Sequence, residues 1–265
     1  MGYTSHRHAC NTKNFLIKIF SEMFPGKPEA QYKHWADRHA DMLSHEQLDS
    51  LAFRRVGCFG GPQVTLHGLT DALNLIRLGK GVILVANHWD RLLLAPVLLA
   101  RQGVVVNVLT MPIHDNDELD CFAKKFLQRK IKNFLHETHG EWRTTNQSTR
   151  SVINSLKNGE VWLILADAWR PEFSNMRNHP FLDGQVSLPS GVERMAKLSG
   201  SRLLLSRVMS DRSGDVSVIF DLLPEDPHDA VGACIRKLEE DVKVRPWAWW
   251  QWGIFHHIRN GTEEC

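Results

Sequence analysis

Short apolar runs that alternate with segments of helical spacing constrain the fold of this chain more than any other feature. We expect strands at 64–66, 82–85, 104–109, 161–165, 203–209 and 216–222, and helices at 14–24, 69–78, 92–100, 117–135, 146–157, 188–199, 228–244 and 246–258. A polar, histidine-rich stretch up to Arg55 predicts one or two further helices. This alternation predicts an α/β fold with a mixed central sheet flanked by helices, after a helical N-terminal segment.

Length and composition indicate one folded domain. The chain has 265 residues, of which 43% are hydrophobic, and this is enough for a single large core. We expect a helical N-terminal segment over 1–60 and an α/β core over 61–265. The formal net charge of +2 is too small for a dedicated nucleic-acid-binding protein.

Cysteine spacing and hydropathy indicate the cellular compartment in which the protein is expected. The five cysteines are scattered, and no pair has zinc-finger or redox spacing, so we expect reduced thiols and no metal site. The apolar run 92–99 contains Pro96 and is far shorter than the ~20 residues that a membrane span needs. The N-terminus lacks a signal-peptide core. We therefore expect a cytoplasmic protein, either free or peripheral on the inner face of the cell membrane.

A polar cluster at the end of a strand is the candidate site. The apolar run that ends at Ala86 leads into Asn87, His88, Trp89, Asp90 and Arg91, and then into a helix. Ligands of open α/β sheets collect at the carboxyl ends of strands. A histidine there is able to act as a general base, with a carboxylate holding its tautomer. The alternative is a turn histidine followed by an aspartate that caps the helix.

Motifs in the same order along residues 64–258 resemble the lysophospholipid acyltransferase superfamily, and most closely the lipid A biosynthesis lauroyl/myristoyl acyltransferases. They comprise a glycine-rich approach to the histidine, a strand followed by a variable loop, a turn before a Pro-Ser-Gly helix start, and a final Pro- and Trp-rich segment. The matching stretches are 66–69, 79–84, 158–161, 166–170, 179–184, 188–196 and 245–252.

This resemblance implies a glycerol-phosphate-acyltransferase-like fold and a fatty-acyl transfer from acyl-CoA or acyl carrier protein to a hydroxyl or amine. The acceptor would be a lipid, a small molecule or a peptide, and the protein a bacterial enzyme of lipid biosynthesis. No cofactor or metal is implied. His88 would be the catalytic base and Asp90 its partner. Substrate contacts are expected from the following residues: Asn87, Arg91, Asp167, Trp169, Arg170, Ser190, Gly191 and Arg194.

The position of the carboxylate departs from the family pattern. The family places Asp or Glu five residues after the histidine, where this chain has Leu93. Asp90 is the carboxylate on the same turn, and Asp167 or Asp115 could substitute from another strand end. The missing carboxylate also leaves open a catalytically inactive relative that binds lipid or an acyl carrier. The chain also shows no N-terminal membrane helix of the kind usual in that family, which weakens lipid A as the acceptor.

Four further features have more than one interpretation each. The tryptophans of 247–252 either line an acyl or lipid surface or pack a final helix on the sheet, and we favour packing. The basic, amphipathic stretch 121–134 is an interfacial helix, a docking face for an acidic carrier, or an ordinary solvated face. Ser190 and Gly191 either cradle an anion or cap a helix, and Asp167 with Arg170 lies on the site rim or in a solvated turn.

Overall fold

The computed structural model describes the backbone of residues 6–113 and 120–260, and the side chains of 12–113 and 120–259. Its helices are α1 (His6–Met23), α2 (Glu29–Ala52), α3 (Leu69–Arg77), α4 (Leu94–Ala100), α5 (Cys121–Thr138), α6 (Arg150–Lys157), α7 (Gly191–Ser199), α8 (Ala230–Val244) and α9 (Phe255–Ile258). Short 3₁₀ helices are η1 (Phe53–Arg55), η2 (Pro227–Asp229), η3 (Pro246–Ala248) and η4 (Trp250–Ile254).

A seven-stranded mixed sheet forms the centre of the described chain, in the order β1-β9-β8-β2-β5-β3-β4. Its strands are β1 (Val64–His67), β2 (Val82–Ala86), β3 (Val106–Thr110), β4 (His139–Thr144), β5 (Val161–Leu165), β8 (Arg202–Ser210) and β9 (Val216–Leu222). The strands from β8 to β4 are parallel, whereas β9 runs antiparallel to β8 and pairs in parallel with β1. The expected α/β architecture with a mixed, helix-flanked sheet is confirmed.

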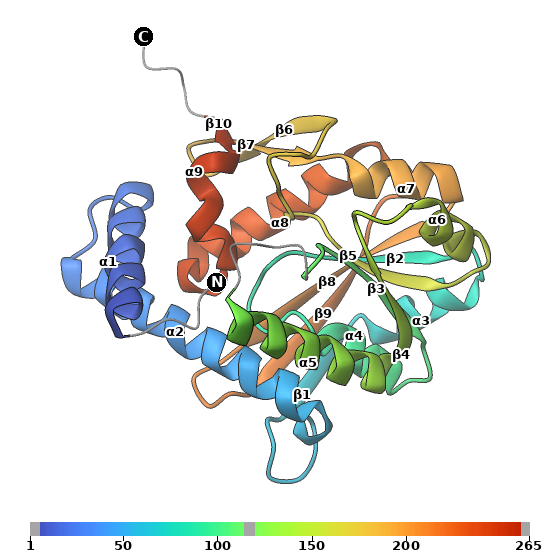
Figure 1. Cartoon of the computed structure of the whole chain (residues 1–265), viewed down its shortest axis with the longest axis horizontal. Helices are drawn as coiled ribbons and strands as arrows, with labels where there is room; N and C mark the ends of the chain where they lie inside the picture. Colours follow the sequence, from blue (N-terminus) through green and yellow to red (C-terminus); the bar gives the residue numbers. More distant parts are fainter. Residues whose placement is uncertain (1–5, 114–119, 261–265) are drawn as a thin grey trace.

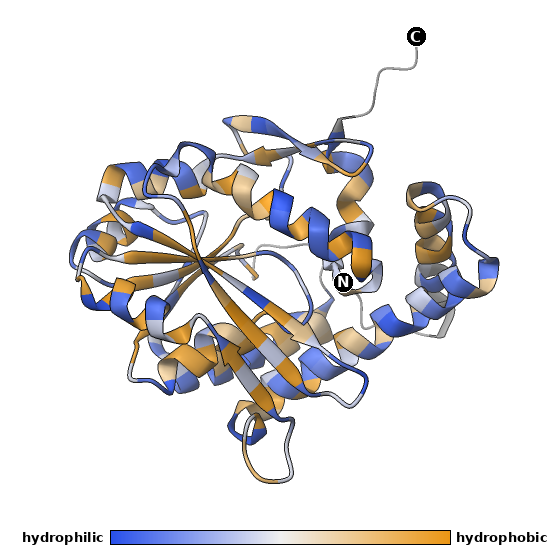
Figure 2. Cartoon of the chain, turned by 180° about the vertical axis from the view of Figure 1, so that it is seen from behind, coloured by the Kyte–Doolittle hydropathy of each residue, from blue (hydrophilic) through white to orange (hydrophobic). Residues whose placement is uncertain are grey.

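Apolar side chains of the sheet alternate between two helical layers. Along β2, Ile83 and Val85 join a core with α1, α2 and α6 to α8, whereas Leu84 joins the core under α3, α4 and α5. In Figure 1, α6, α7 and α8 lie on one side of the sheet and α3, α4 and α5 on the other, and the strands between them are mostly hydrophobic in Figure 2. Because both faces are buried, β2 is apolar throughout and needs no polar alternation.

A glycine sets the entry to β2. Gly81 has φ +71°, and a Cβ there would lie 2.0 Å from the carbonyl oxygen of Leu156. This close approach of two backbones requires glycine. It fixes where β2 starts, and therefore where the strand ends and the polar cluster begins.

Several elements differ from those expected. Strand β4 is absent from the prediction, as is the small antiparallel sheet of β6 (Met176–Phe181), β7 (Gly184–Pro189) and β10 (Arg259–Asn260). The helix expected from residue 188 starts at Gly191 because β7 extends to Pro189. The single helix expected over 246–258 is wrong. It is broken into η3, η4 and α9 because Trp249 has an extended backbone and forms a β-bridge with Trp89.

Candidate active site

His88 lies just beyond the carboxyl end of β2. The neighbouring strand β5 pairs with β2 in parallel, with Ala86 opposite Leu165, so both strands end at the same level. The residues that follow them therefore meet at one edge of the sheet. This register brings Asp167, two residues beyond β5, against His88.

The His88–Asp167 pair is the central contact of the site. Nδ1 of His88 is 2.9 Å from Oδ1 of Asp167, and the backbone N–H of His88 donates to the same carboxylate at 2.9 and 3.0 Å. The Asp167 side chain is fully buried, whereas 23% of the His88 side chain is exposed. Within the described residues, Nε2 of His88 makes no hydrogen bond. The contact with Asp167 thus fixes the imidazole ring through Nδ1, and Nε2 is the nitrogen that could take part in proton transfer.

The C-terminal segment completes the wall around this pair. The indole Nε1–H of Trp249 donates to Oδ2 of Asp167 at 2.9 Å, and the N–H of Trp250 donates to the carbonyl of His88 at 2.9 Å. The Trp250 ring lies 6.0 Å from the imidazole, centroid to centroid. Residues about 80 and 160 positions apart therefore build one site.

Gln251 also reaches the imidazole, with its Nε2 2.7 Å from Nδ1 of His88. One ring nitrogen cannot both donate to Asp167 and accept from an amide N–H. The carboxylate is the stronger acceptor, so Nδ1 carries the proton and the amide of Gln251 fits with its oxygen toward the ring. This tautomer leaves Nε2 with its lone pair, as a general base requires.

The expected pairing of His88 with Asp90 is corrected by this geometry. The Asp90 carboxylate accepts the backbone N–H and the hydroxyl of Ser210 at 2.7 Å each, and its carbonyl accepts Nε1–H of Trp250. Asp90 has φ +45° and is buried, and this turn directs its side chain to β8 rather than back to His88. Burial raises the pKa of Asp90, opposed by the bonds from Ser210 and the nearby arginines.

Two other residues expected to bind substrate face inward. Arg91 is buried, and its guanidinium binds the Asp49 carboxylate at 2.5 and 2.6 Å and the Gly214 carbonyl at 2.6 Å. Asn87 is buried against α8, where its Nδ2 approaches the carbonyl of Cys234. In this structure both side chains therefore fix the loop to its surroundings, and their expected contact with a substrate stays a prediction.

The remaining expected residues divide between the site and its surroundings. Asp167 is buried behind His88 and not on the rim, and its expected contact with a substrate stays a prediction. Trp169 is half-buried and stacks on His257 at 5.5 Å, and Arg170 is half-buried in the same loop. Ser190 donates to the carbonyl of Asn175, whereas Gly191 and Arg194 are exposed on α7. No described contact joins these three residues to His88. Asp115 lies outside the described residues.

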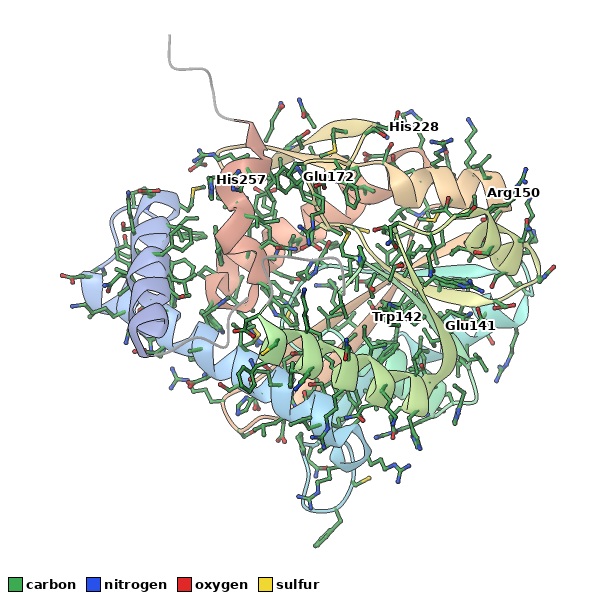
Figure 3. All side chains as sticks on the ribbon, in the orientation of Figure 1. Glu141, Trp142, Arg150, Glu172, His228 and His257 are labelled. Carbon is green, nitrogen blue, oxygen red and sulfur yellow. The ribbon has the colours of Figure 1, made fainter. Side chains whose placement is uncertain are left out.

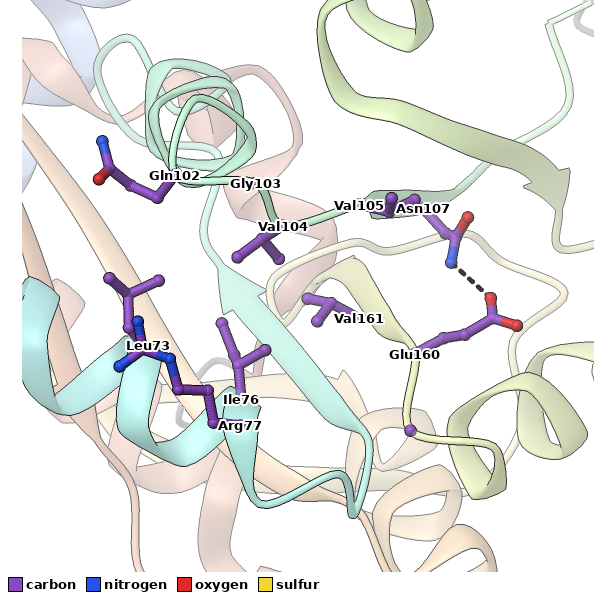
Figure 4. Close-up of a pocket in the computed structure, with 11 residues that line it drawn as sticks. Leu73, Ile76, Arg77, Gln102, Gly103, Val104, Val105, Asn107, Glu160 and Val161 are labelled. Atoms are coloured by element: carbon purple, nitrogen blue, oxygen red, sulfur yellow. Dashed lines mark hydrogen bonds between the residues drawn. The ribbon is translucent and has the colours of Figure 1, made fainter.

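Two hollows of the described surface lie elsewhere. One, of about 520 Å³, is lined by residues that precede β3 and β5, among them Val104 and Glu160, with Asn107 bonded to Glu160 at its edge (Figure 4). It lies at the amino ends of these strands, opposite to His88. A second hollow, of about 300 Å³, lies between η1 and the end of α5. Neither is lined by His88.

Sequence reasoning missed Trp249, Trp250 and Gln251 as site residues. Gln251 is the one polar side chain among the tryptophans of 247–252. Gln251 is buried, and a buried side-chain amide needs a hydrogen-bond partner. The polar residue in this apolar run is therefore the sequence feature that indicates a buried polar contact. Nothing in the sequence indicates that the partner is a histidine about 160 residues earlier.

Within the described residues, no cluster of three or more His, Cys, Asp or Glu side chains is arranged to hold a metal ion. In the same part of the chain, no helix combines the length and the apolarity needed to cross a bilayer. No family model matches this chain, and no curated protein does either.

Proposed function

We propose that this protein is an acyltransferase that moves a fatty-acyl or related acyl group from a thioester to a hydroxyl or amine. The proposal rests on the His88–Asp167 pair at the carboxyl end of two parallel strands. The ordered resemblance of residues 64–258 to the lysophospholipid acyltransferase superfamily supports it, with a glycerol-phosphate-acyltransferase-like core. His88 is the base in this proposal, and Asp167 replaces Asp90 as its partner.

The proposed reaction is direct transfer. Nε2 of His88 accepts the proton of the acceptor, whose oxygen or nitrogen attacks the thioester carbonyl. The tetrahedral intermediate collapses with cleavage of the C–S bond, and the imidazolium returns its proton to the departing thiolate. Asp167 stabilises the imidazolium while it exists. Arg170, half-buried three residues beyond Asp167, is our candidate for stabilising the oxyanion.

The co-substrates follow from this chemistry. The donor is an acyl-CoA or an acyl carrier protein thioester, and the acceptor is a lipid, a small molecule or a peptide. No further cofactor takes part in the proposed steps. The protein would act in the cytoplasm or at the inner face of the cell membrane. The inactive alternative is based on the missing carboxylate at Leu93, and Asp167 weakens that reason because it supplies a carboxylate from the loop that follows β5.

A thiol-release assay tests the proposal. Purified protein with acyl-CoA or acyl carrier protein and candidate acceptors should release free thiol only when an acceptor is present. His88→Gln should reduce this release at least about a hundredfold, because general-base catalysis contributes that much. His228→Gln, an exposed histidine at another edge of the molecule (Figure 3), is the matched control and should retain the rate. Acceptor-dependent release that survives His88→Gln would refute the mechanism.

A further inference from the structure

The outer side of α5 carries a row of basic residues. Lys125, Arg129, Lys132 and His136 are all exposed, and their spacing of three or four residues places them on one side of the helix. Glu137 is the one acidic residue of α5, and it is largely buried in an ion pair with Arg54. The 18 residues of this helix extend over ~27 Å. The exposed side of α5 is therefore long, straight and positive.

Exposed phenylalanines lie at both ends of this row. Phe122, in the first turn of α5, is 72% exposed, and Phe59, in the loop between η1 and β1, is fully exposed. Figure 1 shows that this loop protrudes from the body of the molecule. Most of Phe122 and all of Phe59 are therefore in contact with water, and covering them with a partner would be favourable.

The loop and the helix form one surface. Arg54 contacts Glu137 at 3.2 Å and Nε2 of His136 at 3.1 Å, and the hollow of about 300 Å³ lies between η1 and α5 at this point. Arg55 is exposed beside it and adds a further cation. We name this surface the α5 face. It consists of Phe59, Arg54, Arg55, His136, Lys132, Arg129, Lys125 and Phe122.

We propose that the α5 face binds the surface of an anionic lipid bilayer. Lysine and arginine attract anionic headgroups, while exposed aromatic side chains enter the boundary between headgroups and acyl chains. A bilayer accepts ring insertion at two points far apart, and this suits Phe59 and Phe122 at opposite ends of the cationic row. An acidic protein would match the charge alone, and it would need two separate pockets for the rings.

The α5 face adjoins the candidate active site through the inner side of the same helix. Lys130 projects inward, pairs with Glu46 and lies 5.2 Å from the Trp250 ring, which in turn borders His88. Docking by α5 would therefore hold His88 near the membrane surface. Binding itself does not depend on acyl transfer, so the His88→Gln variant should bind vesicles like the unmodified protein.

Vesicle flotation tests the docking surface. The full chain should float with phosphatidylcholine vesicles that contain phosphatidylglycerol, and much less with phosphatidylcholine alone. Binding should weaken as salt rises, because the charges are exposed. The triple variant K125E/R129E/K132E should bind at least about tenfold more weakly. Phe59→Ser should also weaken vesicle binding, although this substitution leaves the charge of the protein unchanged.

Two controls keep the test specific. The triple variant R150E/K157E/K197E reverses three exposed cations on α6 and α7, on the side of the molecule where Figure 3 labels Arg150, and should bind normally. Val244→Ser removes a residue that is 73% exposed at the end of α8 and should also bind normally. Equal loss in both triple variants, or no vesicle binding by the unmodified protein, would overturn the proposal. Binding of an acidic carrier protein without vesicle binding would assign the α5 face to a protein partner instead.

Discussion

At the residue scale, two aspartates close to His88 have different tasks. Asp167 holds the imidazole, whereas Asp90 fixes the turn to β8 through Ser210. The sequence correctly places His88 just beyond the end of a strand, because an apolar run leads directly into it. It cannot assign the carboxylate, since that depends on the register of β2 and β5 and on the backbone turn at Asp90. Asp167 was only one of three aspartates that the sequence left open.

Trp249→Phe tests whether the hydrogen bond from the Trp249 indole to Asp167 contributes to the activity. The variant keeps an aromatic ring in the core but loses the Nε1–H that donates to Oδ2. A hydrogen bond to a charged group contributes about 1.5–3 kcal/mol, so we expect thiol release to fall by roughly tenfold or more with little change in the acceptor KM. Trp252→Phe, whose Nε1–H donates to the Pro246 carbonyl instead, is the control. A similar fall in both variants would mean that core packing alone matters.

At the element scale, the loop of residues 87–91 is tied to three separate elements. Arg91 joins it to α2 and to the β8–β9 turn, Asp90 joins it to β8, and the backbone of Trp250 joins it to the C-terminal segment. Apolar runs predict the central strands correctly because both faces are buried. Strand β4, at the sheet edge, has a polar sequence and gives no such signal. The break at Trp249 depends on its β-bridge with Trp89, a residue that the local sequence does not contain.

Arg91→Met tests the tie between the loop and α2. The substitution leaves Asp49 buried without its partner, and breaking a buried ion pair in this way costs about 3–5 kcal/mol. We expect the free energy of unfolding in urea to fall by that amount. The double variant Arg91→Met with Asp49→Leu should recover much of the loss, since neither charge then remains. If the single variant unfolds like the unmodified protein, the pair does not hold the loop.

At the scale of the whole molecule, the N-terminal and C-terminal segments of the described chain pack against each other. Trp252 packs edge-on against Phe20 of α1 at 5.5 Å, and His39 of α2 donates from Nδ1 to the Trp247 carbonyl at 2.7 Å. The expected packing of the tryptophan-rich segment on the core is confirmed for Trp249 and Trp252, which are buried. The N-terminal helices thus support the segment that surrounds His88.

Low pH should weaken the packing of the N-terminal helices against the C-terminal segment, because His39 takes part in this packing. Burial lowers the pKa of His39 below its ordinary value of 6.5, so the unfolded chain binds a proton more readily than the folded one. Stability from this group is complete above pH 6.5 and is lost as the pH falls toward the lowered pKa. His39→Asn keeps a donor and cannot titrate. The variant should be about 1 kcal/mol less stable at about pH 7.5, and this deficit should shrink as the pH falls to about 5. A deficit that is constant with pH would contradict this.

The most direct test of the account compares Asp167→Asn with Asp90→Asn in the thiol-release assay. The first substitution would present an amide N–H where the site needs an acceptor, which disturbs the imidazole tautomer, and the rate should fall by about 10³–10⁴. The second substitution places an asparagine at a position with positive φ, which asparagine tolerates. The new amide is able to accept the N–H of Ser210 through its oxygen and to donate to the Ser210 hydroxyl through its nitrogen. The rate should then stay within about threefold. A large loss in Asp90→Asn with a normal rate in Asp167→Asn would contradict the central claim.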